Sequence, residues 1–284
     1  MKTDRLNSKG NFGNWDSAYK HLLTFTKGQQ PTLGEVDESW LLVLKQYLLN
    51  DAKTPGKTKL SQNSALSYFN KVKATLRQAF EKKLIRENPA LRVRGIKEVE
   101  TKREFLTWEE VEKISKTKCD VKKLKEAFLF SIMTGLRWSD IIKMTWSEVR
   151  GSDSEGWYVR FQQQKTKDYE VLPITKPARE LLGKNGEPDQ RVFIGLRYSN
   201  YTNIALSRWM KVSGVDRAIT FHCGRHTHAT LLLNQGVDIY VVSKLLGHKN
   251  IRTTEIYAKV SQNKKIEAIN KLPQLNIVES VKQS

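Results

Sequence analysis

Four polar side chains that could act together on a phosphate lie in one stretch of the sequence, between residues 220 and 258. They interrupt its apolar helical residues and are His222, Arg225, His248 and Tyr257. A guanidinium can bind two phosphate oxygens at once, an imidazole can exchange a proton, and a phenol can serve as a nucleophile. The stretch therefore predicts chemistry at a phosphodiester, with Tyr257 attacking the phosphorus.

Arginine side chains from two parts of the sequence are predicted to hold that phosphate. His222 and Arg225 are three positions apart at the start of an expected helix, on one face of it and near N–H groups that favour anions. Arg137, in the run T-G-L-R-W-S-D, lies at an expected corner between two helices. Two permanently charged guanidinium groups can stabilise a pentacoordinate transition state, which favours a mechanism without a metal ion or other cofactor.

The remaining steps of such a reaction are proton transfers. His222 and the arginine pair are expected to help the phenol of Tyr257, whose ordinary pKa is about 10, to lose its proton. Lys165 is expected to protonate the leaving oxygen from a hairpin, with Lys167, on the same side of the strand, as the alternative. His248 is expected to hydrogen-bond the phosphate.

The histidine-rich run that begins at residue 222 also raises the question of a metal site. Only His222 and His226 have useful helical ligand spacing, and no distant pair of ligands is evident, so no metal is predicted. His226 and His228 are interpreted as structural residues. Taken singly, each catalytic candidate also has an ordinary structural explanation, and only their combination favours chemistry.

Basic residues are spread over the whole chain of 284 residues, which has a formal net charge of +19 and a pI of about 9.8. Lysine and arginine outnumber aspartate and glutamate by 19 to 10 in residues 1–102 and by 30 to 20 in the remainder. Because both halves are basic, we expect a long polyanion, double-stranded DNA, to be held by both. A solvated basic surface or a membrane-surface protein would also explain the charge alone.

The cysteine content and the distribution of apolar residues indicate the cellular setting. Two cysteines are too few for a disulfide scaffold. The sequence has neither an apolar segment at its start nor an apolar run of about 18 residues. We therefore expect no membrane partner and a cytoplasmic protein that is associated with the nucleoid when it binds DNA.

The first part of the sequence predicts a bundle of helices, residues 1–97, followed by a charged linker at 98–103. A helix is expected to begin at a cap, Asn14 or Asp16, after a loose lead-in. A long helix is expected over 61–83, with Lys71, Lys73 and Arg77 on its exposed side. These three residues either form a solvated face or contact the DNA backbone, and we assign them to DNA binding.

The second part, residues 104–284, predicts a mixed domain of helices and one small sheet. Thr107 and Glu110 have capping-box spacing, and helices are expected over 121–134, 177–182 and 200–212. The runs W-Y-V-R-F-Q-Q-Q and Y-E-V-L-P-I alternate as two strands of a hairpin, with a third strand near Glu148. Ser139 or Asp140 is expected to cap the short helix that follows residue 137. The fold class is thus mainly α with a small β-hairpin sheet.

Together, these motifs resemble those of the tyrosine recombinase (phage integrase) family. The matching runs within residues 105–260 are T-G-L-R-W-S-D, K-T-K, H-C-G-R-H, L-L-G-H and the tyrosine at 257. The resemblance implies one nucleophile, Tyr257, and five activating residues: Arg137, Lys165, His222, Arg225 and His248. It also implies a 3′-phosphotyrosyl link, release of a 5′-hydroxyl, and strand exchange within a homotetramer on two DNA sites.

The resemblance further implies that residues 1–97 form a helical, SAM-like core-binding domain that clamps DNA together with the catalytic domain. It favours an integrase of a mobile element and leaves room for accessory DNA-bending proteins. The additional N-terminal arm-binding domain of many mobile-element integrases is not visible in this sequence. Two other functions stay open: a non-catalytic DNA-binding or architectural protein on the same fold, and strand passage like that of a type IB topoisomerase.

Two positions depart from the pattern of the family. Gly224 stands where a larger apolar residue is common, so we expect looser packing around it. Asp140 stands in place of the commoner glutamate and is expected to keep a capping role. The C-terminal segment over 266–281 is expected to pack either on a neighbouring protomer or on its own domain.

Overall fold

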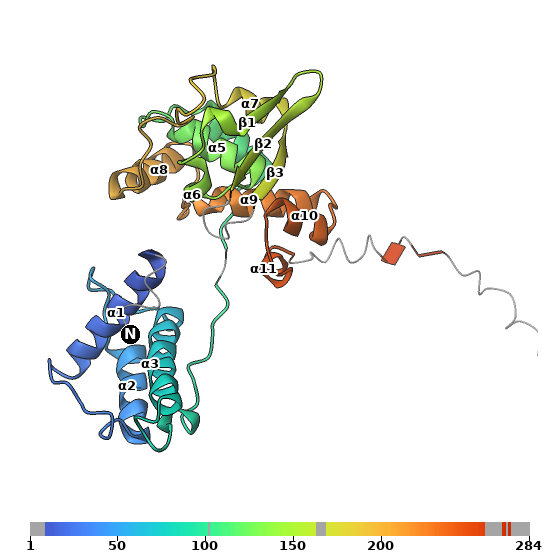
Figure 1. The fold of residues 1–284 in the computed structure, drawn as a ribbon. Helices are drawn as coiled ribbons and strands as arrows, with labels where there is room; N and C mark the ends of the chain where they lie inside the picture. Colours follow the sequence, from blue (N-terminus) through green and yellow to red (C-terminus); the bar gives the residue numbers. More distant parts are fainter. Residues whose placement is uncertain (1–8, 102, 163–168, 259–268, 271, 274–284) are drawn as a thin grey trace, which may run out of the picture. The chain divides into compact units, whose positions relative to one another are not determined.

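The computed structural model describes residues 9–101, 103–162, 169–258, 269–270 and 272–273. The chain divides into two compact units, Met1–Thr101 and Lys102–Ser284 (Figure 1). Each unit builds its own hydrophobic core. Within the described ranges, every helix lacks either the length or the apolar character that crossing a membrane requires.

The first unit is a helical bundle. Its elements are α1 (Lys9–Phe25), α2 (Glu38–Asn50), α3 (Gln62–Glu81) and the short 3₁₀ helix η1 (Pro89–Leu91). Because α1 begins at Lys9, the predicted start at Asn14 or Asp16 was wrong. Gly10 and Gly13 suggested a loose lead-in, but one glycine disfavours a helix by only about 1 kcal/mol, which did not prevent helix formation.

The second unit packs helices against a small sheet, which confirms the predicted fold class. Its elements in chain order are α4 (Trp108–Lys116), α5 (Leu124–Thr134), α6 (Trp138–Ile141), η2 (Trp146–Glu148), β1 (Val149–Ser152), β2 (Gly156–Gln162), β3 (Tyr169–Ile174), α7 (Lys176–Glu180), α8 (Asn200–Val212), α9 (His222–Asn234), α10 (Ile239–Leu245) and α11 (Arg252–Glu255). The predicted capping box is confirmed, because the Thr107 hydroxyl accepts from the Glu110 N–H while the Glu110 carboxylate accepts from the Thr107 N–H.

The sheet is antiparallel with the strand order β1-β2-β3, as the alternating sequence runs predict. Val159 on β2 lies opposite Leu172 on β3, and both side chains are buried in the same core as α5. Their neighbours Tyr158 and Val171 are exposed on the other face. The period of two along each strand therefore separates a core face from a solvent face.

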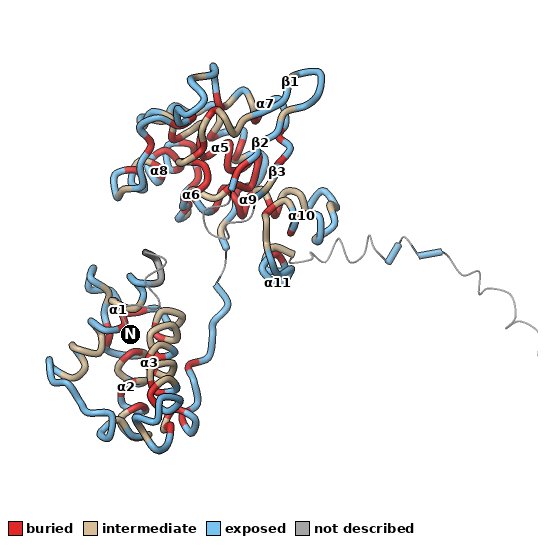
Figure 2. Tube along the Cα trace, viewed as in Figure 1, coloured by how far each residue is buried: buried red, intermediate tan, exposed pale blue. Residues whose placement is uncertain are grey.

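Helices α5 and α9 form the buried centre of the second unit (Figure 2). They approach closely at Gly224, where an added Cβ would lie 3.0 Å from Oγ and 3.1 Å from Cβ of Ser131. Ser131 is itself held by the hydrogen bond that its hydroxyl donates to the carbonyl of Leu136 at 2.9 Å. The expected looser packing at Gly224 was therefore wrong, because the glycine permits a tight helix crossing.

We expect Gly224→Val to lower the free energy of unfolding by about 1–3 kcal/mol, since the larger side chain overpacks the contact with Ser131. The shift is measured as an earlier midpoint of urea unfolding followed by circular dichroism. Gly13→Val is the matched control, because Gly13 also lies in a helix but has nothing within 4 Å of its added Cβ. Equal shifts for both variants would show that the crossing at Gly224 is not tight.

Candidate functional site

Arg225 joins three segments of the second unit. Its Nη1 donates to the carbonyl of Gly135, at the end of α5, at 2.7 Å, and its Nη2 donates to the carbonyl of Leu246, at the end of α10. The side chain is only 3% exposed. The runs T-G-L-R, H-C-G-R-H and L-L-G-H are thus brought together around one guanidinium.

The buried guanidinium of Arg225 keeps its charge. Burial, followed by the charge of Arg137, lowers the pKa of Arg225 to about 9, so the group is still protonated at neutral pH. A guanidinium has five N–H donors, and the two carbonyls do not use all of them. Arg225 can therefore organise the loops and present further donors to a phosphate oxygen.

Arg137 lies at the N-cap position of α6, and its Nη1 is 4.0 Å from Oδ2 of Asp140. Asp140 is 3% exposed, and the side chain of the N-cap residue Arg137 makes no capping hydrogen bond. The expectation that Ser139 or Asp140 occupies the cap position of α6 was therefore wrong. Since Arg137 occupies the cap position, Asp140 falls inside the helix, where its carboxylate faces the arginine and orients it.

A pocket of about 460 Å³ lies beside these groups. Three predicted residues contribute to its lining, namely Arg137, Arg225 and His248. The ring of His248 is oriented by Thr254, whose buried hydroxyl lies 2.8 Å from Nδ1. The structure therefore places two arginines and one histidine from separate segments around one hollow.

The charge of the pocket suits an anion. Lys244 and Lys249 also line it, while the acidic residues of the lining are Asp140 and Glu170. The sequence analysis missed both lysines, although they flank the run L-L-G-H directly and could have been found there. Together with the two arginines they give the lining a net excess of positive groups.

Tyr257 follows α11 and is half-buried beside a small apolar cluster of α9 and α10. Its hydroxyl lies 2.8 Å from Nδ1 of His226. Burial raises the pKa of Tyr257, and the positive charges of Arg225, Arg103 and Arg137 act against this rise. The nucleophile candidate is thus neutral and within reach of the charges of both arginines of the pocket.

His226, which we interpreted as structural, is the histidine that hydrogen-bonds Tyr257. His222, expected beside the phenol, packs edge-on against His226 with ring centroids 4.4 Å apart. The sequence signal was available, because residue 226 lies one turn beyond 222 on the same face of α9. Within the described residues, no group of three or more His, Cys, Asp and Glu side chains could hold a metal ion.

Several predicted positions fall outside the described residues. Lys165 and its alternative Lys167 belong to residues 163–168, and most of the C-terminal segment over 266–281 is also outside. The strands that lead to these lysines are described, and they stay paired up to Gln162 and Tyr169. The proton donor to the leaving oxygen therefore stays a prediction.

The three basic residues of α3 differ in what they contact. Lys73 donates to the carbonyl of Val93 at 2.9 Å, and Lys71 lies 5.6 Å from the ring centre of Trp15. Both are half-buried, so the expectation that they load an exposed side was wrong. Arg77 is exposed.

Comparison with known proteins adds two family matches. The model of the phage integrase family matches residues 104–264, and that of a phage integrase SAM-like domain matches residues 1–94. A tyrosine recombinase of Pseudothermotoga lettingae is 29% identical over 248 residues, which are 82% of either chain. The ICEBs1 integrase of Bacillus subtilis is 25% identical over 247 residues, covering 77% of this chain and 67% of that protein.

Lambda integrase has a similar fold in two solved complexes. Its dimer bound to a COC′ core site gives a TM-score of 0.70 at 21% identity, covering 96% of this chain and 94% of that one. Its tetramer bound to a Holliday junction gives a TM-score of 0.69 at 22% identity, covering 89% and 73%. At 21% and 22% identity, this likeness shows that the fold is shared.

Proposed function

The chain belongs to the phage integrase family, and from this premise we propose that it is a site-specific recombinase that cleaves and rejoins DNA through Tyr257. The main support for assigning catalytic roles to these residues is the pocket lined by Arg137, Arg225 and His248. The charges of both arginines also act on Tyr257, where they favour loss of the phenol proton. These groups supply the charges and the nucleophile that phosphodiester exchange requires.

The proposed reaction proceeds by transfer of one phosphoryl group. The Tyr257 oxygen attacks the phosphorus and loses its proton to a base, while Arg137 and Arg225 bind the non-bridging phosphate oxygens, aided by His222 and His248. The bond to the 5′ oxygen breaks, Lys165 protonates that oxygen, and a 3′-phosphotyrosyl link results. A 5′-hydroxyl then attacks this link and releases the tyrosine. Because the stabilising charges are guanidinium groups, the proposed mechanism needs no metal ion.

The partner that we propose is double-stranded DNA bound by both units. The first unit serves as the core-binding domain, with Arg77 as its exposed candidate contact on α3 and Lys71 and Lys73 as further ones. The tetramer of lambda integrase supports a homotetramer on two sites, and accessory DNA-bending proteins complete the proposed assembly. The likeness to the ICEBs1 integrase supports a role in a mobile element. Such an enzyme works in the cytoplasm, on the nucleoid.

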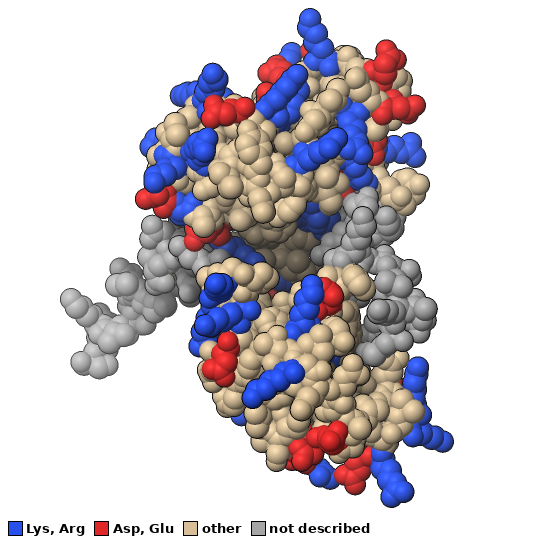
Figure 3. Space-filling model, turned by 90° about the vertical axis from the view of Figure 1, so that its left-hand side faces the viewer, with Lys and Arg blue, Asp and Glu red and all other residues tan. Residues whose placement is uncertain are grey.

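We expect DNA affinity to fall by decades between about 50 and 200 mM salt, since each neutralised phosphate releases counterions. Lysine and arginine side chains are visible on the surface of both units in Figure 3, in keeping with many dispersed phosphate contacts. The measurement is a series of binding titrations at fixed pH. An affinity independent of salt would remove DNA as the main partner.

The catalytic proposal is tested by incubating the protein with a DNA site that carries a nick near the cleavage point, in the presence of EDTA. We expect a covalent protein–DNA adduct and a free 5′-hydroxyl, because the short cleaved fragment diffuses away and prevents rejoining. Absence of an adduct on the cognate site would favour the non-catalytic DNA-binding alternative. Relaxation of supercoiled plasmid without exchange between two sites would favour the topoisomerase-like alternative.

A further inference from the structure

The contact between His226 and Tyr257 has no role in the reaction as proposed above. His226 lies on α9 between the phosphate-binding Arg225 and the buried Thr227, and only 5% of it is exposed. Its Nδ1 is 2.8 Å from the phenol oxygen, and the two ring centroids are 5.2 Å apart. A nitrogen within hydrogen-bond reach of a nucleophile satisfies the first requirement for a general base.

We propose that His226 accepts the proton of Tyr257 during cleavage and returns it during rejoining. This inference rests on the proposed function of Tyr257 as the nucleophile. As the bond from the phenol oxygen to phosphorus forms, the O–H bond breaks and its proton passes to Nδ1 of His226. The bond to the 5′ oxygen breaks, and that oxygen takes its proton from the separate donor, Lys165. Rejoining runs the same transfers in reverse.

The charge state of the pair before DNA binds is consistent with this role. Burial first, and then the charges of His222, Arg103 and Arg225, lower the pKa of His226 to about 3. The imidazole is therefore neutral at pH 7, and Tyr257 is neutral because burial raises its pKa. We assign to His226 the neutral tautomer with its hydrogen on Nε2, in which Nδ1 accepts the hydrogen of the phenol.

Groups from three segments surround the ring of His226, and the charges of His222, Arg103 and Arg225 lower its pKa. His222 and Arg225 belong to α9 itself, Arg103 belongs to the segment before α4, and Tyr257 faces the ring from beyond α11. The cations among them are groups that a DNA phosphate would neutralise. Since an opposite charge nearby favours a protonated imidazole, DNA binding should raise the pKa of His226 and make it a better base.

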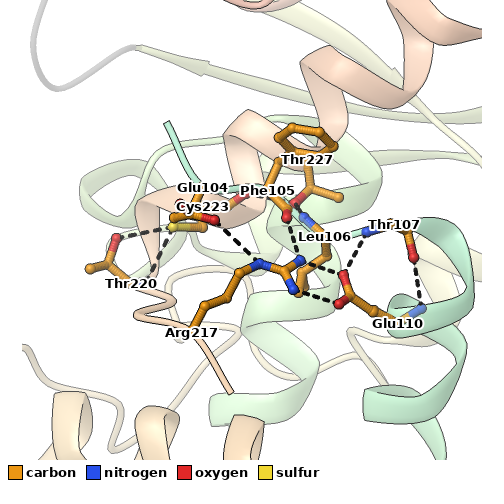
Figure 4. A network of polar contacts seen from close by, with 9 residues as sticks. All are labelled: Glu104, Phe105, Leu106, Thr107, Glu110, Arg217, Thr220, Cys223 and Thr227. Carbon is orange, nitrogen blue, oxygen red and sulfur yellow. Dashed lines mark hydrogen bonds and ion pairs between the residues drawn. The ribbon is translucent and has the colours of Figure 1, made fainter. Parts of the chain in front are cut away.

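A polar network holds the residues that follow Arg103 in the chain (Figure 4). Arg217 makes ion pairs with Glu104 and Glu110 and donates to the carbonyl of Phe105 at 2.7 Å. The N–H of the next residue, Leu106, donates to the hydroxyl of Thr227 at 2.9 Å. The chain next to Arg103 is therefore fixed against α9, one residue from His226.

The test is the rate of adduct formation on the nicked site, in a single turnover, between pH 6 and 9. In His226→Asn, an amide oxygen can take the place of Nδ1 and keep the hydrogen bond, but it cannot hold the proton. We expect the rate at pH 7 to fall by about 10²–10⁴-fold, and the deficit to shrink about tenfold per pH unit as hydroxide replaces the base. Rejoining of the isolated adduct should be slowed by the same factor at each pH.

His228→Asn is the matched control, because His228 lies on the same helix and hydrogen-bonds the carbonyl of Ile132 at 2.9 Å, away from Tyr257. We expect its pH profile to run parallel to that of the wild type. A deficit in His226→Asn that is constant with pH, or no deficit, would overturn the proposal while leaving Tyr257 as the nucleophile. Failure of the wild type to form any adduct would instead overturn the proposed function.

A second measurement leaves His226 in place, in case its variant does not fold. Replacing Tyr257 by 3-fluorotyrosine makes the phenol more acidic without removing its oxygen. With His226 as the base, we expect the cleavage rate to stay flat with pH above 7 in both proteins. The opposite result would be a cleavage rate that rises with pH in the wild type, with the same rise beginning at a lower pH in the fluorinated protein. That result would show that the phenol ionises without help and would overturn the proposal.

Discussion

Tyr257→Phe is expected to abolish the covalent adduct on a nicked DNA site completely, because the ring that remains has no oxygen to attack phosphorus. The substitution should leave the fold intact, since the ring still packs with Ala229, Val242 and Leu246. DNA affinity should also be retained, because the phosphate contacts lie elsewhere. The measurements are denaturing gels of the reaction and binding titrations at the same salt concentration.

Tyr201→Phe is the matched control for this variant. Tyr201 is 68% exposed on α8 and does not line the pocket, so its loss should change neither cleavage nor binding. An adduct that persists in Tyr257→Phe would mean that another side chain is the nucleophile. That result would also remove the basis for assigning a base at His226.

Arg225→Ala is expected to lower the cleavage rate by about 10²–10³-fold, which is typical for the loss of one donor to a transition-state oxygen. It should also destabilise the second unit, because the carbonyls of Gly135 and Leu246 lose their donor, at about 1–3 kcal/mol for each unsatisfied group. Most DNA binding should remain. Single-turnover cleavage, urea unfolding and binding titrations measure the three quantities.

Arg225→Lys separates charge from geometry. An ammonium keeps the positive charge but is a compact point charge, so it cannot bridge the two carbonyls as a planar guanidinium does. We therefore expect stability and cleavage to recover only in part. If binding and cleavage instead fall by the same factor in Arg225→Ala, the residue contributes affinity alone and its proposed catalytic role is wrong.

Much of this fold follows from local patterns in the sequence. The alternation around Val159 and Leu172 predicted the paired strands, and the spacing of Thr107 and Glu110 predicted a helix start. These features depend on residues a few positions apart, or on a repeat along one element. The start of α1 was misplaced because glycines in the lead-in were given more weight than their small energetic effect justifies.

The contacts that were missed join residues distant in sequence. Arg225 binds a carbonyl 90 residues away, and His226 meets a hydroxyl 31 residues away. The motif order indicated which residue types belong together but not which histidine faces the phenol. Gly224 was misread for the same reason, since the Ser131 side chain that fills the space beside it belongs to another helix.

The most direct test of the central claim is to digest the trapped protein–DNA adduct with trypsin and nuclease and to identify the modified peptide by mass spectrometry. We predict that the peptide T-T-E-I-Y-A-K, residues 253–259, carries a nucleotide joined through its 3′-phosphate to Tyr257. A nucleotide on any other residue, or exchange of strands without a modified peptide, would contradict the assignment of Tyr257 as the nucleophile.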